Sequence, residues 1–172
     1  LDNLLPFKGD CEYQDKVLIT MHRRENHHWL GQWFKEISDI AAAHPHIEFI
    51  LPLHPNPNVQ KYKHHLSSWV NIVHPMDHDV LIKLLTKVKL VITDSGGIQE
   101  ECSFFNKKCL VARKVTERPE SVGITSFMVN NPIELKDLFD KHISTYRVNT
   151  QSPYGDGHSS KKICDIFNLT NK

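Results

Sequence analysis

The stretch Leu90-Val-Ile-Thr-Asp-Ser-Gly-Gly97 decides the fold of this 172-residue chain. Residues 90–93 are apolar or β-branched, which predicts a short buried strand. Asp94-Ser95-Gly96-Gly97 then makes a polar, glycine-rich turn, and the apolar spacing over 98–105 predicts a helix. A strand that passes through a tight turn into a helix is the repeating unit of open α/β sheets.

The same alternation continues in both directions from this stretch. Four more strands are predicted, at Lys16–Met21, Ile47–Leu51, Val70–Val73 and Lys108–Ala112. Helices are predicted between and after them, at Trp29–Ala43, Val59–Ser67, Val80–Lys87, Ile133–Ile143 and Ser159–Asn168. Strands that alternate with helices pair in parallel, so we predict an α/β, Rossmann-like three-layer domain with a parallel β-sheet.

Composition narrows the possible partners. The formal net charge is +1 and no Lys/Arg run exceeds a pair, so the broad basic surface of a nucleic-acid-binding protein is missing. No run of 18 apolar residues occurs, and the amino terminus lacks the pattern of a signal peptide. We therefore expect a soluble, cytoplasmic protein without nucleic-acid or membrane partners.

The cysteines and histidines do not form a metal-binding pattern. Cys11, Cys102, Cys109 and Cys164 are scattered without a C-x-x-C pair, as is usual for reduced structural thiols. None of the twelve histidines has the i, i+4 spacing around a glutamate that marks a helical zinc site. We expect no metal and no cofactor.

Chemically distinctive residues follow the predicted strands at their carboxyl ends. They lie at residues 22–26, 54–58, 94–97 and 116–120, after the first, second, fourth and fifth strands. In an open parallel sheet these ends lie at one edge, where helix amino termini favour anions. The connections at the opposite edge are short and unremarkable in composition. A ligand site is therefore expected at the carboxyl edge.

The turn at Ser95, Gly96 and Gly97 suits a phosphate, because glycines allow close approach and the next helix starts with free amide donors. Ser95 adds a hydroxyl donor. Glu101, one turn later, is placed to accept hydrogen bonds from sugar hydroxyls. An isolated Ser-Gly-Gly is more often a tight turn with no ligand, but its position at a strand end favours binding.

A permanently charged guanidinium would complete a diphosphate site, and Arg118 is the best placed candidate. Arg23 and Arg24 could equally be solvated loop residues. His22 directly follows a buried strand, where an imidazole can bond a phosphate oxygen or transfer a proton. The alternative for His22 is a purely structural histidine.

These motifs together resemble the carboxy-terminal domain of the non-hydrolysing UDP-N-acetylglucosamine 2-epimerases. The matching stretches are His22-Arg-Arg-Glu-Asn26, His54-Pro-Asn-Pro-Asn-Val59, Thr93-Asp-Ser-Gly-Gly-Ile-Gln-Glu-Glu101, Thr116-Glu-Arg-Pro-Glu120 and Pro153-Tyr-Gly-Asp-Gly157. They occur in the family's order and cover nearly all of residues 16–167. The loop 75–81 departs from the family, because many bacterial members carry aromatic residues there, near the uracil.

The resemblance implies a GT-B-like enzyme of two Rossmann-type domains with a UDP-sugar between them. It implies diphosphate contacts from Ser95, Gly96 and Gly97, ribose contacts from Glu101, and phosphate contacts from Arg118 and His22. His22 is also the catalytic candidate. Arg23 and His54 would belong to a second, allosteric UDP-GlcNAc site. The family reaction eliminates UDP and adds it back with the opposite configuration at C2, which gives UDP-ManNAc from UDP-GlcNAc.

On this resemblance, residues 1–15 are a linker remnant and residues 16–172 are the carboxy-terminal UDP-sugar-binding domain, which ends in a helix. The amino-terminal catalytic domain would be absent, supplied in cis or by a partner chain, and a homo-oligomer is expected. Two other functions remain open. One is a non-catalytic UDP-sugar-binding or regulatory module, and the other is the donor domain of a GT-B glycosyltransferase, since fold does not decide function.

Overall fold

The computed structural model describes residues 1–170, with side chains through Asn168. Its centre is a six-stranded sheet in the order β3-β2-β1-β4-β5-β6, in which every neighbouring pair is parallel. The strands are β1 (Gln14–Thr20), β2 (Glu48–Pro52), β3 (Val70–Val73), β4 (Val88–Thr93), β5 (Lys108–Val111) and β6 (Ser126–Met128). The chain builds the sheet outward in one direction from β1 and in the other from β4. This is the Rossmann order, with its switch point between β1 and β4, and the predicted fold class is confirmed.

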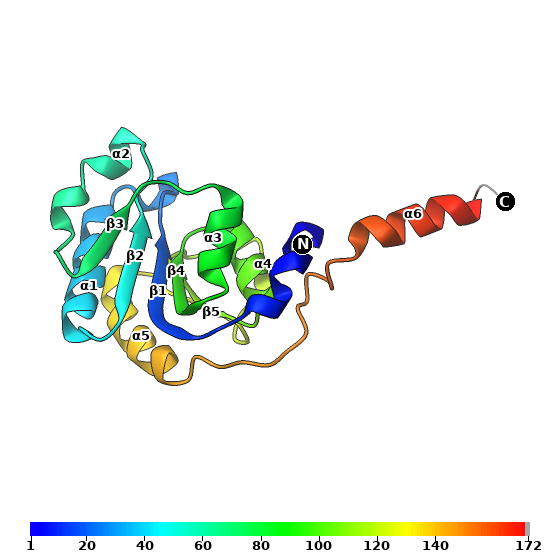
Figure 1. Ribbon diagram of the computed structural model, residues 1–172. Helices are drawn as coiled ribbons and strands as arrows, with labels where there is room; N and C mark the ends of the chain where they lie inside the picture. Colours follow the sequence, from blue (N-terminus) through cyan, green and yellow to red (C-terminus); the bar gives the residue numbers. More distant parts are fainter. Residues whose placement is uncertain (171–172) are drawn as a thin grey trace.

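Helices cover both faces of the sheet (Figure 1). Helices α1 (Leu30–Ala43) and α5 (Leu135–Ser144) share one apolar core with Val17 and Ile19 of β1. Helices α3 (His78–Leu85) and α4 (Gly96–Phe104) share the core on the other face with Leu18. Successive side chains of a strand point to opposite faces, so β1 contributes to both cores and is buried between them.

Two elements differ from the sequence prediction. Strand β6 was not predicted, since three residues carry too little pattern to separate a strand from a loop. The single polar helix predicted over 59–67 is wrong. The chain instead forms a short α2 (Pro57–Gln60) and a 3-10 turn, η3 (Lys63–His65). Only Val59 of this region is fully buried, and a helix without an apolar face gains little from the core.

The residues before β1 are folded against the domain. They form a 3-10 helix, η1 (Asp2–Asp10), whose Leu4 is only 1% exposed and lies in the core with α3 and α4. A Cβ at Gly157 would lie 2.9 Å from the Leu5 side chain, so the carboxy-terminal tail runs close over η1.

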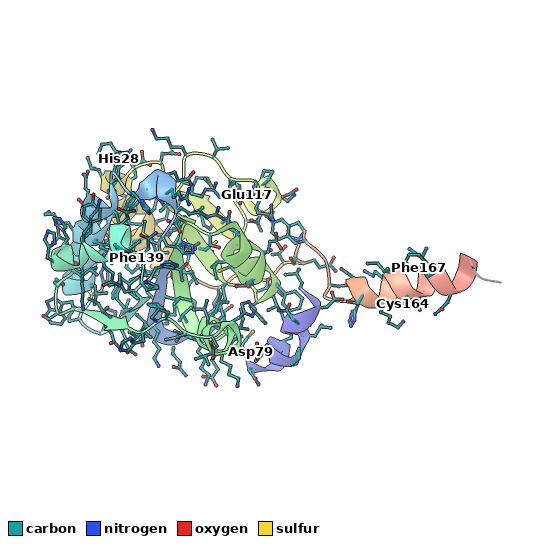
Figure 2. The ribbon with its side chains drawn as sticks, turned by 90° about the horizontal axis from the view of Figure 1, so that it is seen from above. His28, Asp79, Glu117, Phe139, Cys164 and Phe167 are labelled. Atoms are coloured by element: carbon teal, nitrogen blue, oxygen red, sulfur yellow. The ribbon has the colours of Figure 1, made fainter. Side chains whose placement is uncertain are left out.

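The last helix, α6 (Ser159–Thr170), begins beside η1 and extends away from the sheet (Figures 1 and 2). The Asp2 carboxylate accepts hydrogen bonds from the amides of Ser159 and Ser160 at 3.0 and 2.6 Å. These bonds and the Ser160 hydroxyl lower the pKa of Asp2 to about 2. Ile163, Ile166 and Phe167 on this helix are more than half exposed. Within residues 1–170, no helix is both long enough and apolar enough to cross a bilayer.

Candidate ligand site at the carboxyl edge of the sheet

Asp94, at the end of β4, organises the edge. It is fully buried, and it accepts hydrogen bonds from the amide of Arg23 at 2.8 Å and from that of His22 at 3.0 and 3.2 Å. The side-chain amide of Asn26 donates to Asp94 at 3.1 Å and to the carbonyl of Ala112, after β5, at 2.9 Å. One carboxylate thus fixes the loop after β1 against the loops after β4 and β5. Asp94 was not among the predicted site residues, although an aspartate directly after a buried strand is a usable signal.

The start of α4 lies at the switch point next to this carboxylate. The Ser95 hydroxyl caps the helix by accepting from the amide of Ile98 at 3.5 Å, and the Ser95 amide donates to Thr93 Oγ1 at 3.0 Å. Within the described residues, the amides of Gly96 and Gly97 donate to no acceptor. Free amides at a helix start carry partial positive charge and suit an anion.

Gly96 also permits a close contact from the loop after β5. A Cβ at this position would lie 2.5 Å from Glu117 Oε1, so a larger residue would force the glutamate aside. Glu117 is labelled in Figure 2. Its carboxylate is held by Arg113 Nη1 at 2.5 Å and lies 3.8 Å from Arg23 Nη2. A bond to its own backbone amide and its pairing with Arg113 lower the pKa of Glu117.

Arg118 lies beside the same helix start, with its Cγ 3.7 Å from a Cβ placed on Gly96. Its guanidinium is ion-paired through Nε with Glu100 of α4, and Nη1 donates to the carbonyl of Glu117 at 3.1 Å. The structure therefore brings Arg118 to the Ser95–Gly97 turn, as expected, but with a carboxylate partner that the sequence did not indicate.

The Glu101 carboxylate is paired with a histidine side chain. Its Oε1 lies 2.9 Å from Nε2 of His78, the first residue of α3, while Oε2 is buried without a partner in the described part of the chain. Burial raises the pKa of Glu101, and the hydrogen bond from His78 opposes that rise. His78 lies in the loop 75–81 that departs from the family, but it was not among the predicted site residues.

The side chains of His22 and His54 are in contact beyond the carboxyl ends of β1 and β2. Their rings contact edge to face with centroids 5.1 Å apart, and His22 Nδ1 lies 3.6 Å from Asp94 Oδ1. Burial lowers the pKa of His22, although the Asp94 charge acts in the opposite direction. The lowered pKa favours the neutral imidazole. Both histidines line a hollow of about 690 Å³ together with Arg23, Arg24, Glu25 and Ser95.

A second cavity of about 590 Å³ lies on the other side of Arg113, over the ends of β5 and β6. Trp29, Trp33, Val115 and Pro132 supply its apolar wall. Arg113 also donates to Glu25 Oε1 at 2.6 Å, so the Glu25–Arg113–Glu117 chain of ion pairs lines this cavity, and Glu25 lines the first hollow as well.

The tail motif at residues 153–157 holds the loop that carries Arg118. The Tyr154 hydroxyl donates to the carbonyl of Arg118 at 2.9 Å, lies 2.9 Å from Ser121 Oγ and accepts from the Ser121 amide at 3.2 Å. These contacts bridge 33 to 36 positions of sequence. Among residues 1–170, no group of three or more His, Cys, Asp or Glu side chains is arranged to hold a metal ion.

Comparison with known proteins places the chain in a family. The family model for UDP-N-acetylglucosamine 2-epimerase matches residues 6–168. The chain belongs to this family. Its relatives include the UDP-N-acetylglucosamine 2-epimerases of Neisseria meningitidis serogroup A, 37% identical over 165 residues, and Campylobacter jejuni, 36% identical over 170. The alignments cover 88% of this chain but only 44% and 42% of those proteins, so the chain spans less than half their length.

Solved epimerase structures agree with this assignment. The S. aureus MnaA–UDP co-structure matches 98% of this chain and 48% of its own with a TM-score of 0.82 and 29% identity. The N. meningitidis epimerase bound to UDP-GlcNAc matches the same shares with a TM-score of 0.80 and 32% identity. An E. coli heptosyltransferase with ADP matches 83% of this chain with a TM-score of 0.59, and at 15% identity it shares the fold alone.

Proposed function

We propose that this chain is the UDP-binding half of a UDP-GlcNAc 2-epimerase and that the carboxyl edge of its sheet holds the nucleotide diphosphate. The observation that carries the proposal is the start of α4, where the amides of Gly96 and Gly97 donate to no acceptor among the described residues. This start lies at the switch point of the sheet, where ligands of Rossmann-type folds bind. Named relatives of the chain act on or are bound to UDP-N-acetylglucosamine or UDP.

Recognition of the diphosphate would combine several donors. The two glycine amides and the Ser95 hydroxyl would contact one phosphate, with the α4 dipole contributing favourably. Arg118 lies close enough to supply a bidentate guanidinium once it exchanges Glu100 for the ligand. The Glu101 carboxylate, with its buried Oε2, would accept from the ribose hydroxyls.

His22 would act at the phosphate. Burial favours its neutral form, its Nδ1 lies 3.6 Å from Asp94 Oδ1, and it lines the hollow that Ser95 also lines. A neutral imidazole can donate to a phosphate oxygen through one nitrogen, with the nearby carboxylate favouring one tautomer. When UDP leaves C1 of the sugar, this donor would stabilise the negative charge that develops on the phosphate.

The remaining parts of the proposal concern partners. Arg23 and His54 line the hollow of about 690 Å³ together with His22, which is compatible with a second UDP-GlcNAc beside the substrate. An amino-terminal half, in cis or in a partner chain, would supply the groups that remove and return the C2 proton. We further propose that the chain forms a homo-oligomer.

Titration with UDP, UMP and inorganic pyrophosphate, followed by amide chemical shifts, tests the proposal. UDP should bind with a dissociation constant of roughly 0.1 mM to several mM, about 4 to 5.5 kcal/mol, and should shift Ser95–Gly97. Arg118→Ala removes a charge-assisted contact worth about 1.5 to 3 kcal/mol and should make binding undetectable. Glu101→Gln should weaken UDP but spare pyrophosphate, and Lys63→Ala, on η3, should change neither. Unperturbed Ser95–Gly97 resonances, or wild-type affinity in Arg118→Ala, would contradict the assigned site.

A further inference from the structure

Glu117 brings a negative charge to a place that suits an anion. Its Oε1 would lie 2.5 Å from a Cβ on Gly96, at the first residue of α4. The amides of Gly96 and Gly97 donate to no acceptor among the described residues, Glu117 included. The carboxylate therefore lies beside the same helix start that is proposed to bind the diphosphate.

Cations surround this carboxylate. Arg113, whose side chain is only 12% exposed, bonds Glu117 Oε2 at 2.5 Å and is fixed on its other side by Glu25 at 2.6 Å. Arg23 Nη2 lies 3.8 Å from Glu117 Oε1. A positive helix end with two arginines is the environment that a diphosphate needs, and Glu117 neutralises part of it.

We propose that Glu117 is an internal competitor of the diphosphate, whose carboxylate must leave the start of α4 before a ligand phosphate can bind there. The inference rests on the proposed function and adds the residue that regulates access to that site. Binding would exchange one anion for another: Glu117 swings away from Gly96, and the phosphate binds the free helix amides.

The local structure allows this movement. The Glu117 side chain is 43% exposed, and its flexible end rather than its backbone contacts Gly96. Arg113 is anchored by Glu25, so it keeps its position when Glu117 moves. The absence of a Cβ at Gly96 is what lets either anion approach. A diphosphate carries more negative charge than a single phosphate ester, so it should displace the Glu117 carboxylate more readily.

Glu117→Gln tests the competition, because it removes the charge and keeps the size of the side chain. Inorganic pyrophosphate and UDP should bind this variant roughly 3- to 30-fold more tightly than wild type, since a repulsive charge a few ångströms from the phosphate is gone. The gain should shrink when the salt concentration is raised to about 0.5 M. Glu120→Gln is the matched control: it makes the same charge change three residues away on an exposed side chain and should leave affinity within about twofold.

A purely structural Glu117 predicts the opposite result, because losing the Arg113 pair would loosen the loop and weaken binding. Equal or weaker binding of pyrophosphate by Glu117→Gln, with wild type binding normally, overturns this inference alone. If wild type binds neither UDP nor pyrophosphate, the proposed function fails with it.

A measurement on wild type does not depend on the variant folding. The side-chain Nε resonance of Arg113 should shift on addition of pyrophosphate, and a UDP complex should show the Glu117 carboxylate away from Gly96. A complex in which the carboxylate keeps its contact with Gly96 while a phosphate binds the α4 amides would contradict the competition.

Discussion

At the scale of single residues, Asp94 shows how a buried charge can be tolerated in this fold. A buried carboxylate is costly unless it is fully hydrogen-bonded, and here the amides of His22 and Arg23 and the side chain of Asn26 surround it. These bonds orient the loop that carries the proposed phosphate ligands. The sequence placed Asp94 in the turn after a strand but could not show that its donors come from 68 to 72 positions earlier in the chain.

His142 is a buried histidine with a pH-dependent consequence. It stacks on Phe127 with ring centroids 3.7 Å apart, and both ring nitrogens are buried without partners among the described residues. Burial and the nearby Lys108 and Lys141 lower its pKa to about 4. Between pH 4 and pH 6.5 the unfolded chain therefore binds more protons than the folded chain. Burial of neutral His142 therefore makes the free energy of unfolding depend on pH. Its contribution, up to about 3 kcal/mol, is complete above about pH 6.5 and is lost as the pH falls toward 4.

Urea unfolding at pH 7 and pH 4.5 measures this loss. His142→Leu should reduce the difference between the two pH values, whereas the exposed His46→Leu should leave it unchanged. His22, whose pKa is also lowered, should still contribute to the pH dependence in both variants. An unchanged pH dependence in His142→Leu would show that His142 is solvated.

At the scale of elements, the segment before β1 contributes to the core. On the family resemblance, residues 1–15 were expected to be a linker remnant. Leu4 and Leu5 are followed by Pro6 and do not form a long amphipathic pattern that would predict a packed helix. In the structure, Leu4 is buried against α3 and α4, and Asp2 binds the first amides of α6. One short 3-10 helix thus contacts both the sheet domain and the last helix.

Truncation of Leu4 tests the importance of η1. Leu4→Ala should lower the free energy of unfolding by about 2 to 4 kcal/mol, the usual cost of removing a fully buried leucine side chain. Asn3→Ala, exposed on the same 3-10 helix, should cost less than about 0.5 kcal/mol. Denaturant unfolding of both variants gives the comparison, and an equal effect would mean that η1 is not part of the cooperative core.

At the scale of the whole molecule, periodicity predicted the sheet, and the distinctive residues after its strands predicted the edge at which the candidate site lies. Five strands and the carboxyl-edge location were predicted because buried parallel strands leave continuous apolar runs. The contacts inside the site could not be predicted. The contacts of Glu117 with Gly96, of His78 with Glu101 and of Tyr154 with Arg118 join loops that periodicity does not relate to one another.

The 172-residue chain alone should not epimerise UDP-GlcNAc. It spans 44% of the N. meningitidis relative, and the family resemblance assigns the C2 proton transfer to carboxylates of the other half. Incubation with UDP-GlcNAc in deuterium oxide, followed by NMR of the C2 proton, is the measurement. Deuterium at C2 or formation of UDP-ManNAc at an enzyme-like rate would show that this chain holds a complete catalytic apparatus.

The contact between Tyr154 and the Arg118 loop also sets an order of events during synthesis. The loop carrying Arg118 leaves the ribosome first, and Tyr154, whose hydroxyl holds this loop, follows 36 positions later. At about 5 to 20 residues per second, this interval lasts roughly 2 to 7 s. The sheet can form from β1 to β6 during that time, since all six strands precede Tyr154. The nascent chain should therefore acquire its fold before it completes the proposed nucleotide site.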